Sequence, residues 1–249
     1  MSAAPAPSGS VGNTLLVSND AATIQQLVQS MQQLAMSPEI CVEVPAALAL
    51  LNHRKFEAVM VDLQLGEQAK TVLDQVRLSA SNRTAVTFTI SNSATETAIA
   101  FAAGSSFVLE RPLSTTSISR TLKAAYGLIV RERRRYFRCP VEIPATVRRE
   151  GGPEVHCRTV NISEGGMAVS TSVPLRPGLQ VQVQFTLPGQ QSQLAAESSI
   201  RWWETGHLGL QFLSLFSEQR SELQEWLSRR LEQNLPESVA EKFRKADLS

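Results

Sequence analysis

The sequence predicts two domains: an α/β domain with a doubly wound parallel sheet, then an all-β domain built as a six-stranded antiparallel barrel with a C-terminal helix. The chain has 249 residues, enough for two domains of ordinary size. In the first half, short apolar runs alternate with helical stretches, whereas in the second half apolar residues recur at every second position. This change of period near residue 139 predicts a change of fold class.

Composition sets the first limits on function. Hydrophobic residues make up 43% of the chain and charged residues 19%, which is typical of globular proteins. The net charge of +1 argues against a general DNA-binding protein. No apolar run reaches the ~18 residues that a membrane span needs, so we expect no membrane insertion. Residues 1–12 lack the basic start and apolar core of a signal peptide, which predicts a disordered leader on a cytoplasmic protein.

The residues that usually carry catalysis or bind metals show no pattern here. The three cysteines have no metal-ligand spacing, and the three histidines are scattered along the chain. Buried apolar packing in a reducing compartment accounts for the cysteines. We therefore expect no enzyme activity, no catalytic residue, no bound metal and no cofactor.

The first domain is expected over residues 13–126, as five strand–helix units. Apolar runs predict strands at Thr14–Val17, Ile40–Val44, Ala58–Val61, Ala85–Ile90 and Ser106–Leu109. Helical stretches follow at about 21–35, 45–53, 68–80, 94–103 and 115–130. Five such units in one domain predict a parallel sheet covered by helices on both faces, the flavodoxin-like form of the doubly wound fold.

The second domain is expected over residues 139–234, as short strands separated by turns. The alternation is cleanest in Leu179–Leu187, where apolar and polar residues alternate between Pro177-Gly178 and Pro188-Gly189. The other strands are expected at 140–149, 154–160, 166–171, 194–203 and 207–213. Leu223, Trp226, Leu227 and Leu231 fall on one helical face, which predicts a helix from Ser217 to Asn234 and a tail over residues 235–249.

Two motifs meet if the first two barrel strands form a tight hairpin. A turn centred on Gly151-Gly152 pairs the strands antiparallel and places Arg138 opposite residue 165. The arginine run of residues 131–138 and the segment Asn161–Gly166 then lie at the same end of one sheet. Guanidinium groups bind phosphate oxygens or the O6/N7 edge of guanine with two hydrogen bonds. Asn161 and Ser163 add donors and acceptors, and glycine lets the backbone approach a ligand.

These two motifs resemble those of the PilZ domain, a bacterial receptor for cyclic di-GMP. The family carries Arg-x-x-x-Arg before the first barrel strand and Asp/Asn-x-Ser-x-x-Gly after the second. Here they read Arg134-x-x-x-Arg138, with Arg133 before it, and Asn161-x-Ser163-x-x-Gly166. The resemblance implies that Arg133, Arg134, Arg138, Asn161, Ser163 and Gly166 bind cyclic di-GMP. Whether one nucleotide or a stacked pair binds stays open.

The first domain resembles the receiver domain of response regulators, but with altered chemistry. Asp62 stands at the position of the phosphoacceptor and Ser91 at that of the hydroxyl residue. The metal-binding acidic pair reads Ser18-Asn19, with Asp20 one step late, and Arg111 replaces the lysine before Pro112. Fewer carboxylates leave a divalent cation short of oxygen ligands. The expectation is a pseudo-receiver used for contact with a protein partner or for homodimerisation, with Asp62 as a weak candidate phosphoacceptor.

Residues 127–138 are expected to form an arginine-rich linker that leads from the last helix of the first domain into the barrel. No proline or clear stop separates Ser117 from Arg135, so the arginines are expected either on the end of this helix or in a short linker after it. Mutual repulsion among its arginines suggests that an anionic ligand orders it, which would change the arrangement of the domains or the binding of a partner. Two other functions stay open: a PilZ adaptor that binds protein without nucleotide, and a response regulator phosphorylated on Asp62 with PilZ output.

Overall fold

The computed structural model describes residues 9–149, 151–233, 235–237 and 239–241. The chain divides into two compact units, the first made of Met1–Arg133 and Asn234–Ser249 and the second of Arg134–Gln233. Most of the predicted leader, Glu150 in the predicted turn and the last eight residues of the predicted tail lie outside the described residues. Within the described ranges, every helix is too short or too polar to cross a membrane.

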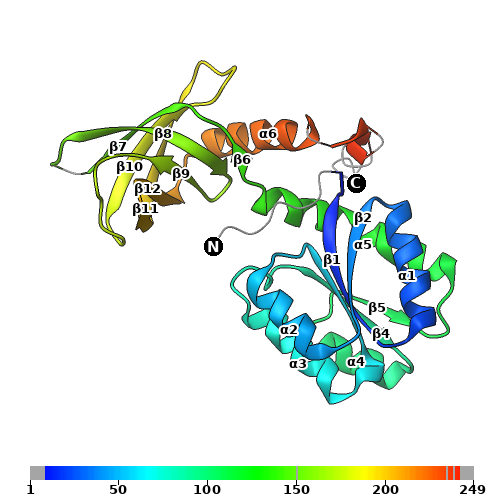
Figure 1. Ribbon diagram of the computed structural model, residues 1–249. Helices are drawn as coiled ribbons and strands as arrows, with labels where there is room; N and C mark the ends of the chain where they lie inside the picture. Colours follow the sequence, from blue (N-terminus) through cyan, green and yellow to red (C-terminus); the bar gives the residue numbers. More distant parts are fainter. Residues whose placement is uncertain (1–8, 150, 234, 238, 242–249) are drawn as a thin grey trace. The chain divides into compact units, whose positions relative to one another are not determined.

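The first unit contains a parallel sheet with the strand order β2-β1-β3-β4-β5 (Figure 1). Its strands are β1 (Gly12–Val17), β2 (Met36–Cys41), β3 (Ala58–Asp62), β4 (Val86–Ser91) and β5 (Phe107–Glu110). This order is that of flavodoxin-like doubly wound sheets, in which functional side chains gather at the carboxyl ends of the strands. The predicted receiver-like fold is confirmed.

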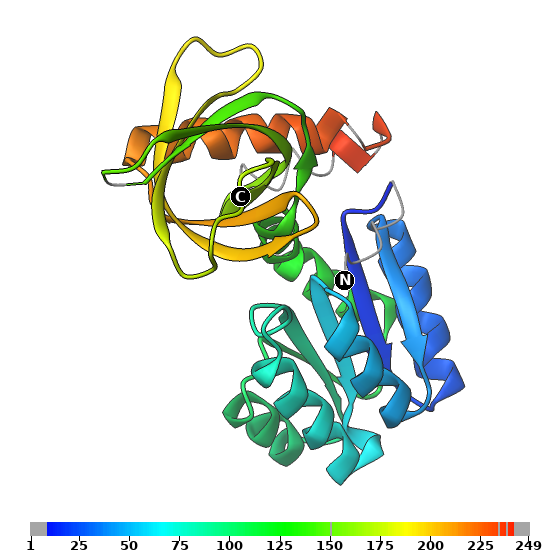
Figure 2. The same cartoon turned by 60° about the vertical axis from the view of Figure 1, so that its left-hand side comes forward.

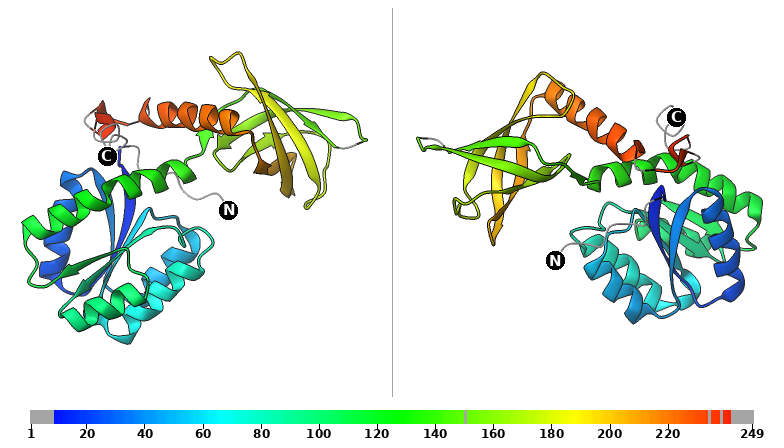
Figure 3. Two further views of the ribbon diagram at one scale, coloured as in Figure 1. Left: turned by 180° about the vertical axis from the view of Figure 1, so that it is seen from behind. Right: turned by 45° about the horizontal axis from the view of Figure 1, so that its top comes forward.

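Helices cover both faces of this sheet (Figure 3). They are α1 (Ala21–Gln33), α2 (Val44–His53), α3 (Glu67–Leu78), α4 (Ala94–Ala102) and α5 (Thr115–Tyr136), with a short 3₁₀ turn, η1 (Leu63–Leu65), after β3. Side chains of α1 and α5 pack with Leu16, Met60 and Phe88, whereas those of α2 and α3 pack with Leu15 and Val59. Because neighbouring residues on a strand face opposite layers, the central strands are apolar on both sides.

Two elements of the first unit differ from their predicted positions. The second strand was expected at Ile40–Val44 but spans Met36–Cys41, and Val44 instead begins α2. Pro38 is tolerated because β2 lies at the edge of the sheet, where a missing N–H breaks no ladder. The last helix was expected at about 115–130 with no stop before Arg135, and it continues to Tyr136, so most of the arginine run lies on the end of the helix. Burial of Ile129, Val130 and Glu132 stabilises this extension.

The second unit is a closed antiparallel barrel (Figure 2). Its strands are β6 (Cys139–Pro140), β7 (Pro144–Arg148), β8 (Glu154–Ser163), β9 (Gly166–Ser170), β10 (Gln180–Thr186), β11 (Gln193–Glu204) and β12 (His207–Ser214), and α6 (Ser217–Gln233) follows. The strands run in the order β6-β8-β7-β10-β11-β12-β9, and β8 also pairs with β9. That last pairing closes the six longer strands into a barrel, as predicted, and leaves no open edge among them.

The barrel core follows from the alternation in the sequence. Val181, Val183 and Phe185 of β10 are buried, whereas the residues between them are not. Helix α6 adds Leu223, Trp226 and Leu227 to the same core, and the Trp226 indole N–H donates to the Pro188 carbonyl at 3.2 Å. Burial raises the pKa of the Cys157 thiol to about 11, which keeps the thiol protonated and unreactive.

The register of the first hairpin differs from the prediction. Pro144 pairs with Arg158, and Cys139 of β6 pairs with Ile162. Arg138 therefore lies two residues closer to Asn161 than its predicted position opposite residue 165. The turn is one cause, because the Gly152 N–H donates to the Arg149 carbonyl. The other is a break between β6 and β7, where the Ile143 N–H donates to the Thr159 hydroxyl at 3.0 Å.

Gly166 is expected to be essential for closure of the barrel. A Cβ added there would fall against the Leu210 carbonyl oxygen, deep inside van der Waals contact, whereas a Cβ at Gly165 would meet nothing within 4 Å. Gly166→Ala should lower the free energy of unfolding of the barrel by about 1–3 kcal/mol. Tryptophan fluorescence during urea denaturation measures this, because all three tryptophans lie in the second unit. Equal losses in Gly166→Ala and Gly165→Ala would contradict it.

Candidate functional site

Arg138 and Asn161 meet at the point where the chain enters the barrel. Arg138 is exposed, and its Nη1 donates to the Asn161 side-chain oxygen at 3.3 Å. Asn161 lies on β8 between two strands, paired with Pro140 of β6 and with Ala168 of β9. This pairing on both sides fixes the backbone that presents the Asn161 amide. Two of the residues expected to bind ligand are thus brought together.

Ser163 and Gly166 shape the loop between β8 and β9. Ser163 is buried, and its hydroxyl donates to the Gly166 carbonyl at 3.0 Å. The Gly165 carbonyl accepts from the Phe212 N–H at 2.9 Å, which ties the loop to β12. The hydroxyl hydrogen of Ser163 is therefore used within the protein, and its lone pairs are what it has left to offer.

Arg134 is the first residue of the second unit and lies beside a carboxylate of α6. Its Nη2 is 4.0 Å from Glu232 Oε1, and the two side chains are 15% and 22% exposed. This separation is at the limit of an ion pair, so the attraction is weaker than that of a hydrogen-bonded pair.

Arg133 is the last residue of α5 that belongs to the first unit, and it also has a carboxylate partner. Its Nη1 is 3.6 Å from Oε1 of Glu57, whose side chain is 2% exposed. The Asn13 N–H donates to the other oxygen of Glu57 at 2.6 Å. Burial raises the pKa of Glu57, and the Arg133 guanidinium opposes that shift by favouring the carboxylate.

The second unit thus combines a closed six-stranded barrel and C-terminal helix with an exposed guanidinium and an asparagine amide at one end. Guanidinium and amide groups of this kind form hydrogen bonds with phosphate oxygens and with base edges. The family model described as "PilZ domain" matches residues 132–229, and the chain therefore contains a PilZ domain over this range. PilZ domains form a family of cyclic di-GMP receptors.

Among curated proteins, the chain is similar to the cellulose synthase catalytic subunit (UDP-forming) of Xanthomonas axonopodis pv. citri strain 306, with 28% identity over 143 residues. The match covers 57% of this chain but only 16% of the length of that relative. Among solved structures, the inhibitor of motility MotI/DgrA of Bacillus subtilis matches with 21% identity and a TM-score of 0.36, covering 39% of this chain and 51% of that chain. A CheY-like receiver domain protein of Methanospirillum hungatei JF-1 matches with 16% identity and a TM-score of 0.43, covering 49% of this chain and 99% of that chain.

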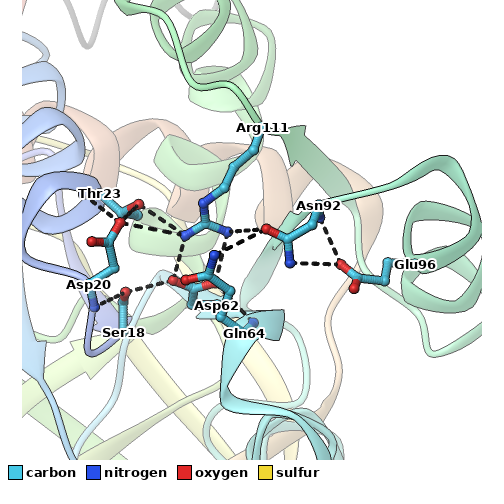
Figure 4. Close-up of polar contacts among 8 residues, drawn as sticks. All are labelled: Ser18, Asp20, Thr23, Asp62, Gln64, Asn92, Glu96 and Arg111. Atoms are coloured by element: carbon cyan, nitrogen blue, oxygen red, sulfur yellow. Dashed lines mark hydrogen bonds and ion pairs between the residues drawn. The ribbon is translucent and has the colours of Figure 1, made fainter.

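A second polar cluster lies at the carboxyl ends of the strands in the first unit, around Asp62 (Figure 4). Asp62 is fully buried at the end of β3. Arg111 donates to its two oxygens at 3.0 and 2.8 Å, which makes a bidentate pair. The Ser18 hydroxyl and the Gln64 N–H add bonds at 2.7 and 3.1 Å. Four donors therefore fill the acceptor sites of this carboxylate.

The Arg111 guanidinium has partners beyond Asp62. It donates to the Thr23 hydroxyl at 2.9 Å and to the Asn92 side-chain oxygen at 3.4 Å, and it lies 3.8 Å from Asp20. The hydrogen bond from the Thr23 hydroxyl, together with the Thr23 N–H, holds the pKa of Asp20 below its usual value. Arg111 is thereby fixed from several directions over the end of the sheet.

The sequence prediction placed some members of this cluster but missed others. Asp62, Arg111 and Ser18 lie together as their positions in the receiver pattern imply, whereas the Ser91 hydroxyl bonds to Thr97 at 2.8 Å. The missed residues are Thr23, Gln64 and Asn92. Asn92 was within reach of prediction, because it directly follows β4 at the edge where receiver-type sites form.

The cluster does not fit a divalent cation of the kind that receiver domains hold. Mg²⁺ requires several oxygen ligands, and an acidic pair normally supplies them. Here Ser18-Asn19 replaces that pair, and the Arg111 guanidinium is bonded to both oxygens of Asp62. A fixed positive charge therefore occupies the place in which a cation would neutralise the site.

Arg111→Ala is expected to destabilise the first unit by about 3 kcal/mol, because it leaves Asp62 buried without a counterion. Differential scanning calorimetry of the full chain measures this loss. Arg54→Ala is the matched control, since Arg54 pairs with Glu39 while both side chains are at least 32% exposed, and it should cost under about 1 kcal/mol. Asp62→Ala/Arg111→Ala should be milder than Arg111→Ala alone. Equal effects of Arg111→Ala and Arg54→Ala would contradict the assignment.

Proposed function

We propose that this protein is a receptor for cyclic di-GMP, which it binds at the end of the barrel where Arg138 meets Asn161. The observation that supports this most is the hydrogen bond between these two side chains within a PilZ domain, which joins the two halves of the ligand-binding pattern. Arg133 and Arg134 are proposed to add phosphate contacts, and the loop of Ser163 and Gly166 to shape the rim of the site.

The chemistry of these groups suits cyclic di-GMP, which carries two phosphates and two guanines. A guanidinium matches the geometry of either group with paired hydrogen bonds, and the Asn161 amide both donates and accepts. Guanidinium and amide groups do not change protonation state near neutral pH, so they are suited to hold a nucleotide rather than to act as the general acid or base of its cleavage. We therefore propose a receptor without turnover.

The receiver-like domain is proposed to act through contacts, with a protein partner or a second copy of the chain, rather than through phosphorylation. Attack of a carboxylate on a phosphoryl donor needs an oxygen with a free lone pair and a cation to neutralise charge. Both oxygens of Asp62 already accept hydrogen bonds from the Arg111 guanidinium. The alternative of a response regulator phosphorylated on Asp62 is accordingly the weaker proposal.

A ligand-independent adaptor is the second candidate function, and one observation favours it. Arg133 and Arg134 each lie beside a carboxylate of the chain itself, so part of the charge that would attract the nucleotide is already neutralised. Arg138, in contrast, bonds to a neutral side chain. Titration with the nucleotide separates the two candidates.

Calorimetric titration of cyclic di-GMP into the full chain should show saturable binding, and Arg138→Ala should weaken it about ten- to hundredfold. That factor corresponds to the ~1–3 kcal/mol of one bidentate arginine contact. The stoichiometry of the titration also gives the number of nucleotides bound per chain.

Arg158→Ala is the matched control, because Arg158 lies on the same strand as Asn161 but pairs with Glu142 on the exposed surface. The affinity of Arg158→Ala for cyclic di-GMP should stay within about twofold of that of the unaltered protein. If the unaltered protein is folded and gives no binding heat, the receptor proposal fails and the adaptor replaces it.

A further inference from the structure

Arg133 has two competing partners if the protein binds cyclic di-GMP. One is the nucleotide, through its phosphates, and the other is Glu57, which lies 3.6 Å away within the first unit. A guanidinium that approaches both its carboxylate and a phosphate must divide its hydrogen bonds between them, or release one. Glu57 therefore competes with the nucleotide for the hydrogen bonds of Arg133.

Hydrogen bonds to Asn13 and Val86 hold Glu57 in place. Its N–H donates to the Asn13 carbonyl, and its carbonyl accepts from the Val86 N–H, each at 2.9 Å. The Asn13 N–H in turn donates to the carboxylate. These bonds anchor Glu57 between β1 and β4, so the Glu57–Arg133 contact is released when the arginine moves rather than the glutamate.

The residue before Arg133 is fastened to the first unit as well. Glu132 is 6% exposed and accepts from the Lys55 ammonium at 2.5 Å and from the Thr84 hydroxyl at 2.6 Å. Consecutive helical residues point about 100° apart, so Arg133 and Arg134 leave α5 in different directions. Arg133 is thus directed to Glu57 while Arg134 is directed to Glu232.

We propose that Glu57 of the receiver-like domain is an internal competitor for the ligand: it holds Arg133 in the absence of cyclic di-GMP, and the nucleotide must displace it. The inference rests on the proposed function and assigns to the receiver-like domain a part in setting the affinity. Only the fraction of molecules in which Arg133 has left Glu57 offers the complete site, and the apparent dissociation constant rises as that fraction falls.

The same competition gives ligand capture an effect on the first unit. When Arg133 leaves, Glu57 loses its counterion in a buried position between β1 and β4. Capture of Arg133 by the ligand would thereby change the charge balance around Glu57. The coupling is reciprocal, since the factor by which the Glu57–Arg133 pair weakens ligand binding is also the factor by which bound ligand weakens the pair.

The test is calorimetric titration of cyclic di-GMP into Glu57→Gln in two backgrounds, with and without Arg133→Ala. Glutamine keeps an oxygen for the Asn13 N–H but removes the charge that attracts Arg133. We expect Glu57→Gln to bind about fivefold more tightly than the unaltered protein when Arg133 is present. In the Arg133→Ala background, Glu57→Gln should leave the affinity unchanged.

Two further variants serve as controls for this titration. Glu39→Gln removes the carboxylate of the Arg54–Glu39 pair in the same unit, and its affinity for the nucleotide should not change. Glu57→Asp keeps the charge but withdraws it by one methylene, so it should give a smaller gain than Glu57→Gln. Melting temperatures of all variants establish that they are folded.

The outcomes separate this inference from the proposed function. Nucleotide binding with equal affinity in Glu57→Gln and the unaltered protein overturns the competition but leaves the receptor in place. An equal gain in affinity on Glu57→Gln with and without Arg133 also overturns the competition. If the unaltered protein and all variants are folded and fail to bind, both proposals are overturned.

Discussion

An arginine keeps its charge at any pH at which the protein is folded, so a guanidinium that leaves water has to meet acceptors within the chain. This constraint accounts for much of what distinguishes the molecule. Arg111 is met by Asp62, Arg133 by Glu57 and Arg134 by Glu232. Arg138 is the exception among these four, since it is exposed and its hydrogen-bond partner in the described residues is the neutral Asn161. Its charge is accordingly the one best placed to attract an anionic ligand.

Two arginine–carboxylate pairs of the first unit differ in strength. In the receiver-like unit, the bidentate Arg111–Asp62 pair occupies both oxygens of the buried carboxylate and joins the end of β3 to the segment after β5. At the end of α5, the Arg133–Glu57 pair has the longer separation, 3.6 Å against 2.8 Å for Arg111–Asp62, which makes it the weaker of the two.

The structural features that depend on local sequence pattern could be predicted from the sequence. The period of two in Leu179–Leu187 gave the barrel strand β10, and the spacing of Asp62 and Arg111 gave the altered receiver site. The register at Arg138 could not be predicted, because it depends on a break in the ladder after a two-residue strand. Glu57 and Glu232 were missed for a different reason. Their arginine partners lie far away in the sequence, and only the folded backbone brings the charges together.

We propose that cyclic di-GMP binds where the arginine segment, residues 131–138, meets the β8–β9 loop. Amide hydrogen exchange of the full chain, followed by mass spectrometry with and without saturating cyclic di-GMP, tests this location directly. With the nucleotide bound, we expect slower amide exchange in peptides that cover residues 131–141 and 160–166, with little change over α2 and α3. Unchanged exchange in both peptides at saturation, or protection confined to the receiver-like domain, would contradict it.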